Sequence, residues 1–204
     1  MNKTYVLPII LIFSILIISC KNEKKQEEAP AEAKTALNLT NENTKVSFTA
    51  YKTTAKIPVK GYFSETSAIL PENASSVTEA LNGLKFEIPV SSLYTNDTIR
   101  DGKLKRSFFG KMINTATLSG TIELDNDTNG TVALNMNGMT TNFPISVSIS
   151  ENTATINGVI DLKNWNALQA LASLNEVCYD LHKGPDGVSK TWEDVAIEVA
   201  TTSE

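Results

Sequence analysis

The sequence predicts an all-β domain with two helical interruptions, built as an antiparallel eight-stranded barrel or strongly curved sheet. After residue 36, apolar and polar residues alternate with a period of two through most of the chain. Turn-forming pairs such as Asn137-Gly138 separate the alternating segments. The span 37–204 contains 168 residues, enough for one domain with a sizeable core, and a barrel leaves no exposed sheet edges.

Residues 1–19 have the parts of a secretory signal peptide. Lys3 gives a short positive region, and the apolar run 5–18 is shorter than the about 20 residues that span a bilayer. The run ends in Ile-Ile-Ser-Cys at 17–20, which resembles the lipobox of bacterial lipoproteins. We therefore expect cleavage before Cys20, lipidation of its thiol and stable anchoring by acyl chains. This predicts a cell-envelope location, on the periplasmic side or at the cell surface.

Amino-acid composition indicates the nature of residues 20–36 and argues against some classes of partner. Residues 20–36 are rich in Lys, Glu, Gln, Ala and Pro and contain no aromatic residue, so we expect a disordered tether behind the lipidated cysteine. The chain has a net charge of −5 and no basic run, which argues against nucleic acid as a partner and against a polybasic membrane-surface helix. If Cys20 carries lipid, Cys178 is left without an intramolecular disulfide partner despite export.

The expected strands follow one another along the domain. In the first, Val46 and Phe48 lie on one face, and each later segment repeats this alternation of apolar positions. The eight segments are 45–52, 57–63, 84–90, 114–124, 132–136, 145–149, 156–162 and 192–199.

Two segments break the alternation and have helical spacing. Residues 97–110 are charged, carry apolar residues at roughly helical intervals, and have Gly110 as a plausible end. For residues 166–182 we expect a helix with Asn166 as its N-cap, an apolar stripe along one face, and an end at Gly184. Helices of this kind would cap or flank the barrel.

The order of these segments resembles the YceI-like family, a lipocalin-like β-barrel that binds long amphiphilic chains such as polyisoprenoids. Residues 59–63 match its Val-x-Gly-x-Phe element, and 86–93 resemble its next strand and turn. Residues 100–109 contain an Arg-Asp-x-x-Leu helix, and 136–140 resemble a Leu-x-Gly-hydrophobic-Thr hairpin. The resemblance implies a hydrophobic or amphiphilic ligand of the isoprenoid or lipid kind.

The chain also departs from the family pattern. The family has one histidine in its first strand and another before the Leu of the Arg-Asp helix, and both are replaced here, in 48–51 and 102–104. A helix and loop from 165 to 190 look like an insertion that the general pattern lacks. The sequence is therefore similar to a divergent branch of bacterial lipoproteins.

The inward faces of the expected strands supply an apolar lining for a ligand. Small residues on these faces, such as Gly61, either leave unfilled volume or bend strands at barrel corners. The expected ligand-binding residues are Phe48, Val59, Phe63, Phe86, Ile88, Leu118, Leu134, Met136, Ile145, Val147 and Trp192.

The sequence offers no catalytic set, so we expect a binding protein that is not an enzyme and uses no cofactor. His182 is the only histidine, and it stands four residues after Cys178. That spacing permits a shared metal or an activated thiol, but two ligands do not make a metal site. The alternative is a buried thiol and a histidine that interacts with the helix dipole.

Three hypotheses for function follow. The leading one is a membrane-anchored lipoprotein that binds a hydrophobic small molecule in a barrel cavity at the cell envelope. The second is an envelope assembly protein with a filled barrel core, which uses the helix and the 183–190 loop for contacts. The third is a metal or redox site at Cys178 and His182.

Overall fold

The computed structural model describes residue 40, residues 42–150 and residues 153–202. All of them belong to one compact unit, residues 34–204, which has its own hydrophobic core and therefore what it needs to fold by itself. The expected signal peptide (1–19), the expected lipidation site Cys20 and the expected tether (20–36) lie outside the described residues. Within the described part, no helix is long and apolar enough to cross a membrane.

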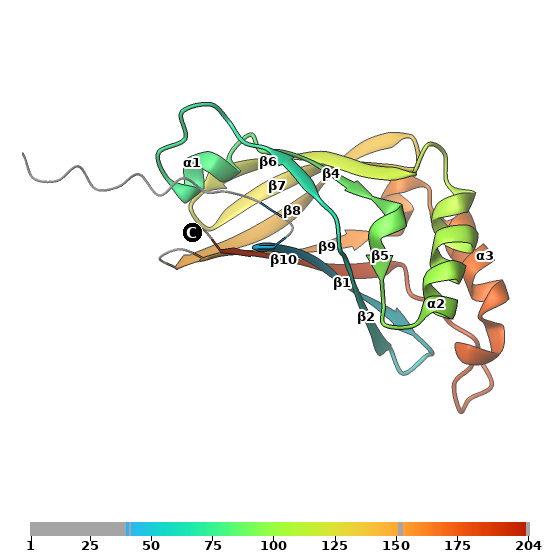
Figure 1. The fold of residues 1–204 in the computed structure, drawn as a ribbon. Helices are drawn as coiled ribbons and strands as arrows, with labels where there is room; N and C mark the ends of the chain where they lie inside the picture. Colours follow the sequence, from blue (N-terminus) through green and yellow to red (C-terminus); the bar gives the residue numbers. More distant parts are fainter. Residues whose placement is uncertain (1–39, 41, 151–152, 203–204) are drawn as a thin grey trace, which may run out of the picture. The chain divides into compact units, whose positions relative to one another are not determined.

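The described strands form one antiparallel sheet of ten strands in the order β3-β4-β6-β7-β8-β9-β10-β1-β2-β5 (Figure 1). Most neighbours in this order are also neighbours in sequence. Hairpins join β1 to β2 and β6 through β9, whereas helical segments connect β3 to β4 and β9 to β10. The strands are β1 (Thr44–Lys52), β2 (Ile57–Phe63), β3 (Ser67–Ile69), β4 (Lys85–Pro89), β5 (Leu93–Tyr94), β6 (Thr117–Asn126), β7 (Asn129–Met136), β8 (Met139–Ser150), β9 (Thr153–Asp161) and β10 (Asp194–Thr202).

The mostly β architecture is confirmed, but the expected count of eight strands is wrong. The eight expected segments correspond to β1, β2, β4 and β6 to β10, and two further strands extend the sheet. β3 pairs with β4 through Ala68 and Phe86, and β5 pairs with β2 through Leu93 and Phe63. These strands have three and two residues, which is too short for an alternating pattern to indicate them.

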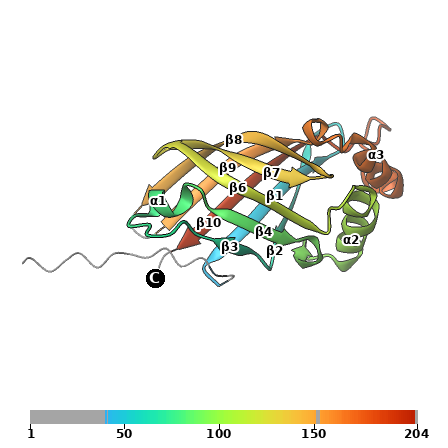
Figure 2. The same cartoon turned by 90° about the horizontal axis from the view of Figure 1, so that it is seen from above.

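Two short segments, 64–66 and 90–92, lie side by side where the two ends of the sheet meet, and we call them the seam. β2 leads into β3 through the first segment, and β4 leads into β5 through a 3-10 turn in the second, where a strand was expected to reach Val90. The amide and hydroxyl of Ser64 donate to the carbonyl oxygen of Ser92 at 3.0 and 3.1 Å. The sheet is therefore strongly curled, as Figures 1 and 2 both show.

The hydrophobic core lies inside the curl. Along β8, Phe143, Ile145 and Val147 are buried and alternate with exposed residues, as period-two alternation requires. Trp165 is fully buried, and its indole Nε1 donates to the carbonyl oxygen of Leu134 at 2.9 Å. The core thus extends from the inner face of the sheet to the segment that precedes the last helix.

Helical elements lie at both ends of the curled sheet (Figure 2). The short helix α1 (Val77–Leu81), which none of the expected segments covers, lies at one end. At the other end α2 (Thr98–Lys103) continues as a π turn (Leu104–Phe108) and a 3-10 turn (Phe109–Lys111). Beside it lie a 3-10 turn (Leu162–Trp165), α3 (Leu168–Val177) and a last 3-10 turn (Tyr179–Leu181).

The structure corrects both ends of the second expected helix. Asn166 is not the N-cap, because it has a φ of 53°, a left-handed conformation that asparagine tolerates, and α3 begins at Leu168. The helix ends at Val177 rather than near Gly184. The amide of Cys178 donates to carbonyls three and four residues back, which tightens the chain into a 3-10 turn.

Candidate ligand cavities

Two cavities lie inside the curled sheet, and their walls are almost wholly apolar. The α1-side cavity has a volume of about 120 Å³ and reaches Leu81 of α1. The α3-side cavity has a volume of about 100 Å³ and lies under Leu104, Leu171 and Leu174. A dry apolar cavity of ~150 Å³ holds a molecule the size of benzene, so each cavity suits a few carbon atoms of a ligand.

The two cavities are adjacent, since the same five side chains line both of them. We call these five residues the waist, and they come from β2, β6, β7, β9 and β10. They are Phe63, Leu118, Leu134, Ile160 and Ile197. A ligand long enough to fill both cavities would have to pass the waist, where only hydrocarbon side chains would need to shift.

Three glycines on the inner face lie under aromatic rings of neighbouring strands. The pairs are Phe48 over Gly61, Phe86 over Gly120 and Phe143 over Gly158. A Cβ added to Gly61 would stand 2.4 Å from Cζ of Phe48, which is closer than real Cβ contacts allow. The rings therefore occupy the volume that the sequence suggested these glycines could leave empty.

Most of the expected ligand-binding residues line one of the two cavities. Val59, which is half-buried on β2, and Val147, which is buried in the core, line neither cavity. The nine that do are Phe48, Phe63, Phe86, Ile88, Leu118, Leu134, Met136, Ile145 and Trp192. The helical side chains Leu104, Leu171 and Leu174 also line the α3-side cavity and were not among the expected residues, although their helical spacing is visible in the sequence.

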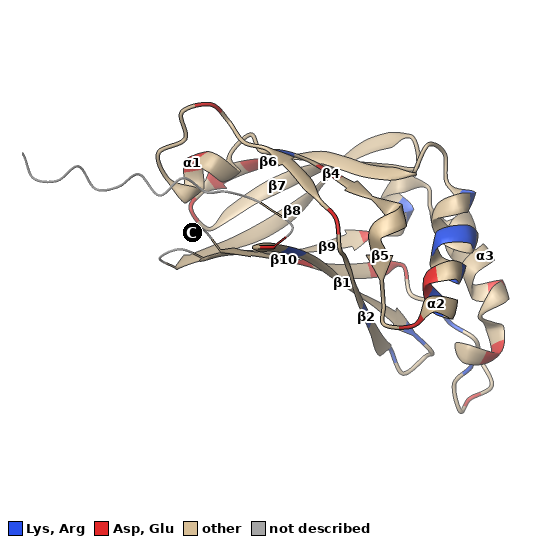
Figure 3. Cartoon of the chain, viewed as in Figure 1, with Lys and Arg blue, Asp and Glu red and all other residues tan. Residues whose placement is uncertain are grey.

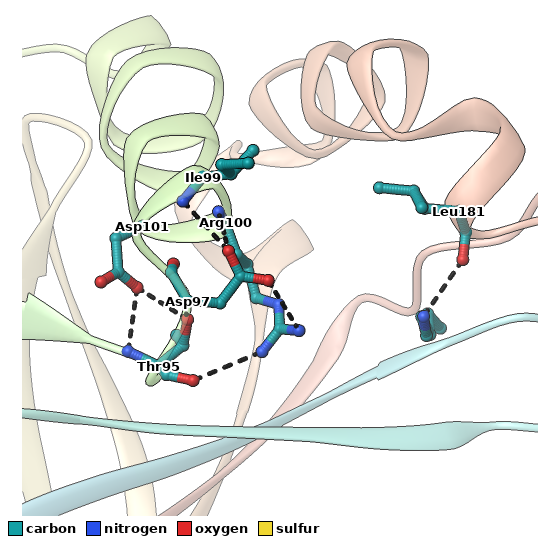
Figure 4. Close-up of polar contacts among 7 residues, drawn as sticks. Thr95, Asp97, Ile99, Arg100, Asp101 and Leu181 are labelled. Atoms are coloured by element: carbon teal, nitrogen blue, oxygen red, sulfur yellow. Dashed lines mark hydrogen bonds and ion pairs between the residues drawn. The ribbon is translucent and has the colours of Figure 1, made fainter.

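The Arg-Asp pair of the family motif fastens α2 at the edge of the α3-side cavity (Figure 4). Asp101 is buried and accepts hydrogen bonds from the amide and hydroxyl of Thr95 at 2.9 and 2.7 Å. Asp97 caps α2 by accepting from the amides of Ile99 and Arg100, both at 3.0 Å. The hydrogen bond from the Arg100 amide lowers the pKa of Asp97. These contacts hold the first turn of α2, and with it the apolar residues that follow.

The side chain of His182 is held by a hydrogen-bond network rather than by a ligand shared with Cys178. The Nδ1 atom of His182 lies 2.6 Å from the hydroxyl oxygen of Thr191, and that hydroxyl donates to the Asn175 side chain at 2.7 Å. Nδ1 is therefore the donor to Thr191, and the imidazole is tied to the loop that leads into β10. Among the described residues no group of three or more His, Cys, Asp or Glu side chains could hold a metal ion.

The electrostatics around this pair disfavour an activated thiol. Burial, with smaller contributions from nearby cations, lowers the pKa of His182 to about 4. Burial also raises the pKa of the Cys178 thiol. A neutral imidazole beside a protonated thiol lacks the charge pairing that makes a cysteine nucleophilic. The cations that act on both groups, and would also repel a metal ion, are Lys52, Lys103 and Arg100.

Comparisons with known proteins agree with this arrangement. A family model described as a YceI-like domain matches residues 37–202. The structure of BcnA from Burkholderia cenocepacia is similar with a TM-score of 0.53 and 18% identity, over 82% of this chain and 100% of that one. A polyisoprenoid binding domain from Saccharophagus degradans is similar with a TM-score of 0.55 and 11% identity, over 79% and 94%. At such identities the likeness is one of fold. No curated protein matches the chain.

Proposed function

Because the chain belongs to the YceI-like domain family, we propose that it binds a hydrophobic or amphiphilic molecule of the isoprenoid or lipid class inside its curled sheet. The observation that carries the proposal is the pair of adjacent apolar cavities that meet at the waist. The similar domain from Saccharophagus degradans is described as polyisoprenoid-binding, which supports the same ligand class. The proposal is one of binding and involves no catalysis and no cofactor.

The walls of the cavities favour a hydrocarbon chain over a polar ligand. Burial of apolar surface stabilises a complex by about 25 cal/mol per Å², and an uncompensated buried hydroxyl or amide costs more than a few buried methylenes contribute. The α3-side cavity has Thr191 as its one polar lining residue, and its hydroxyl already bonds to Asn175. The chain of an amphiphile would therefore lie inside, and its polar group would remain at the end of the sheet.

We also propose that the protein acts at the cell envelope, anchored by lipid on Cys20, either on the periplasmic side or at the cell surface. The lipobox-like residues 17–20 and the short apolar run before them support this part of the proposal. An anchor of this kind would keep the binding domain close to a source of lipid. Metabolic labelling with a palmitate analogue tests it, because Cys20→Ser should abolish the label.

Mass spectrometry of organic extracts from purified protein tests the ligand proposal. We expect a bound lipid or isoprenoid, or uptake of a fluorescent prenol by protein that has been stripped of lipid. Leu134→Phe adds volume at the waist and should lower the amount bound. Val147→Ile adds volume at a buried position that lines neither cavity and serves as the control. A clean extract together with no uptake of the prenol would disprove the proposal.

A further inference from the structure

An unusual share of exposed hydrophobic side chains lies on the pair of helical segments at one end of the sheet. We call the outer side of residues 98–113 and 168–181 the helix-pair surface. Of the eleven large hydrophobic side chains exposed among the described residues, six belong to it. They are Ile99, Ile113, Leu168, Val177, Tyr179 and Leu181. Contiguous exposed apolar groups on a soluble domain usually mark an interaction site.

The two segments lie side by side along their length, so these residues share one end of the molecule (Figures 1 and 2). In the first half of residues 98–113, Lys103 Nζ donates to the carbonyl oxygen of Val177, the last residue of α3, at 3.0 Å. At the other end, the amide of Ile113 donates to Asn137, whose side chain donates to the carbonyl oxygen of Trp165, both at 2.8 Å. The segments thus run in opposite directions.

The same surface carries a concentration of positive charge in an acidic chain. Residues 97–111 contain five lysine and arginine side chains against two acidic residues. Asp97 pairs with Arg100 at 3.4 Å, and Asp101 is buried and bonded to Thr95. The exposed cations of this stretch are Arg106 and Lys111. The chain as a whole has a charge of −5. Figure 3 shows this cluster as blue bands on α2 and the segment after it. The acidic residues of the second segment are Glu176 and Asp180.

We propose that the helix-pair surface docks onto an anionic lipid bilayer. Exposed aliphatic side chains beside lysine and arginine are the pattern of segments that lie in a membrane interface, where headgroups meet the cations and acyl chains meet the apolar groups. A second copy of this chain fits less well. A two-fold axis through residues 98–111 would bring the exposed Arg106 and Lys111 of both copies together, and like charges across an interface are repulsive.

Docking in this orientation would bring the α3-side cavity to the bilayer. Leu104, Phe108 and Leu171 line that cavity from the inner sides of the same two segments. Apolar side chains of the two segments therefore face inward over the cavity, and the outer face carries both exposed apolar and cationic side chains. The docking proposal stands without any ligand in the cavity, because it depends only on the outer face.

Vesicle binding by residues 34–204, without the N-terminal anchor, tests the proposal. The probes are vesicles of phosphatidylcholine alone and vesicles with one quarter phosphatidylglycerol. Each cation near an anionic surface contributes about a fivefold factor to partitioning, so Arg106→Glu, a change of two charges, should lower binding to the anionic vesicles roughly 25-fold. Lys85→Glu, on the exposed start of β4 that follows α1, is the matched control and should give only a small change.

A second pair of variants tests the apolar contribution. Ile99 and Ile69 are both 72% exposed, but Ile69 lies on β3, paired with Lys85 and away from the helix pair. Ile99→Ser should lower binding about fivefold, and Ile69→Ser should leave it unchanged. Circular dichroism melting checks each variant, and Lys111→Glu replaces any charge variant that fails to fold.

Three outcomes would overturn the proposal. They are absence of binding to anionic vesicles by the parent chain, equal losses in the control variants, and a dimer in sedimentation equilibrium that Ile99→Ser converts to monomer. The last outcome would assign the helix-pair surface to self-association instead.

Discussion

The substitution Gly61→Ala tests whether the phenylalanine rings, rather than empty space, occupy the inner face. An alanine in a strand is normally more stable than glycine by about 0.5–1 kcal/mol, because glycine loses more backbone freedom on folding. Here the new Cβ would stand 2.4 Å from Cζ of Phe48 and 2.9 Å from Cγ2 of Thr95. Phe48 is buried and packs against Phe63 with ring centroids 5.8 Å apart, so its ring can yield only toward the α3-side cavity that it lines.

We expect Gly61→Ala to lower the free energy of unfolding by about 1–2 kcal/mol. Overpacking costs ~1–3 kcal/mol, and movement of the ring into the α3-side cavity, which Phe48 lines, would relieve part of it. Urea unfolding of residues 34–204, followed by circular dichroism, measures the change. The displaced ring should also lower uptake of the fluorescent prenol.

Two further variants make the interpretation specific. In the double mutant Gly61→Ala/Phe48→Leu the smaller side chain should recover part of the loss, with a coupling energy of about 0.5–2 kcal/mol. Gly102 lies within α2, and a Cβ added there would stand 3.0 Å from the flexible end of the Arg106 side chain. Gly102→Ala should therefore raise the free energy of unfolding by up to about 1 kcal/mol. If Gly61→Ala is as stable as the parent chain or more stable, the packing argument is wrong.

Three other predictions rest on single contacts. Because the folded pKa of His182 is about 4 and its ordinary value is 6.5, the unfolded chain takes up the proton first as the pH falls. The free energy of unfolding in urea titrations should therefore fall by ~1–2 kcal/mol, after solvent screening, as the pH is lowered from 6.5 to 4. His182→Asn should flatten this pH dependence, and an unchanged dependence would contradict the prediction. Asp101→Ala leaves the amide and hydroxyl of Thr95 without their acceptor and should cost about 2–3 kcal/mol in urea unfolding, whereas Asp101→Asn should cost less. Trp165→Phe removes the donor to the Leu134 carbonyl and some core volume, so thermal melting should show a loss of about 1–3 kcal/mol; an unchanged melting temperature would refute this.

The strands could be predicted because their signal is local. In β8, every second residue from Phe143 to Val147 is buried, and the printed sequence shows the same alternation without any structure. The 97–110 helix was also predictable, since Asp97 caps it and apolar residues recur at helical spacing. What these segments share is length, because a period becomes visible only over several repeats.

The remaining features depend on contacts between distant segments. β5 has two residues and exists because Tyr94 pairs with Tyr62 of β2, a register that no local pattern indicates. The rings over the glycines likewise require knowing that Phe48 lies opposite Gly61. Asn166 is a residue type that favours the N-cap position. In the structure it follows the fully buried Trp165 and adopts a left-handed conformation instead.

The seam gives the sheet a preferred place to give way under load. β9 and β10 pair through nine residues, whereas β2 meets β5 through two and β3 meets β4 through three. Between them, the Ser64 and Ser92 contacts take the place of a regular ladder. A hydrogen-bonded sheet yields first where the fewest bonds must break together. Separation along the seam would therefore widen the interior of the curled sheet while leaving the long strand pairings intact.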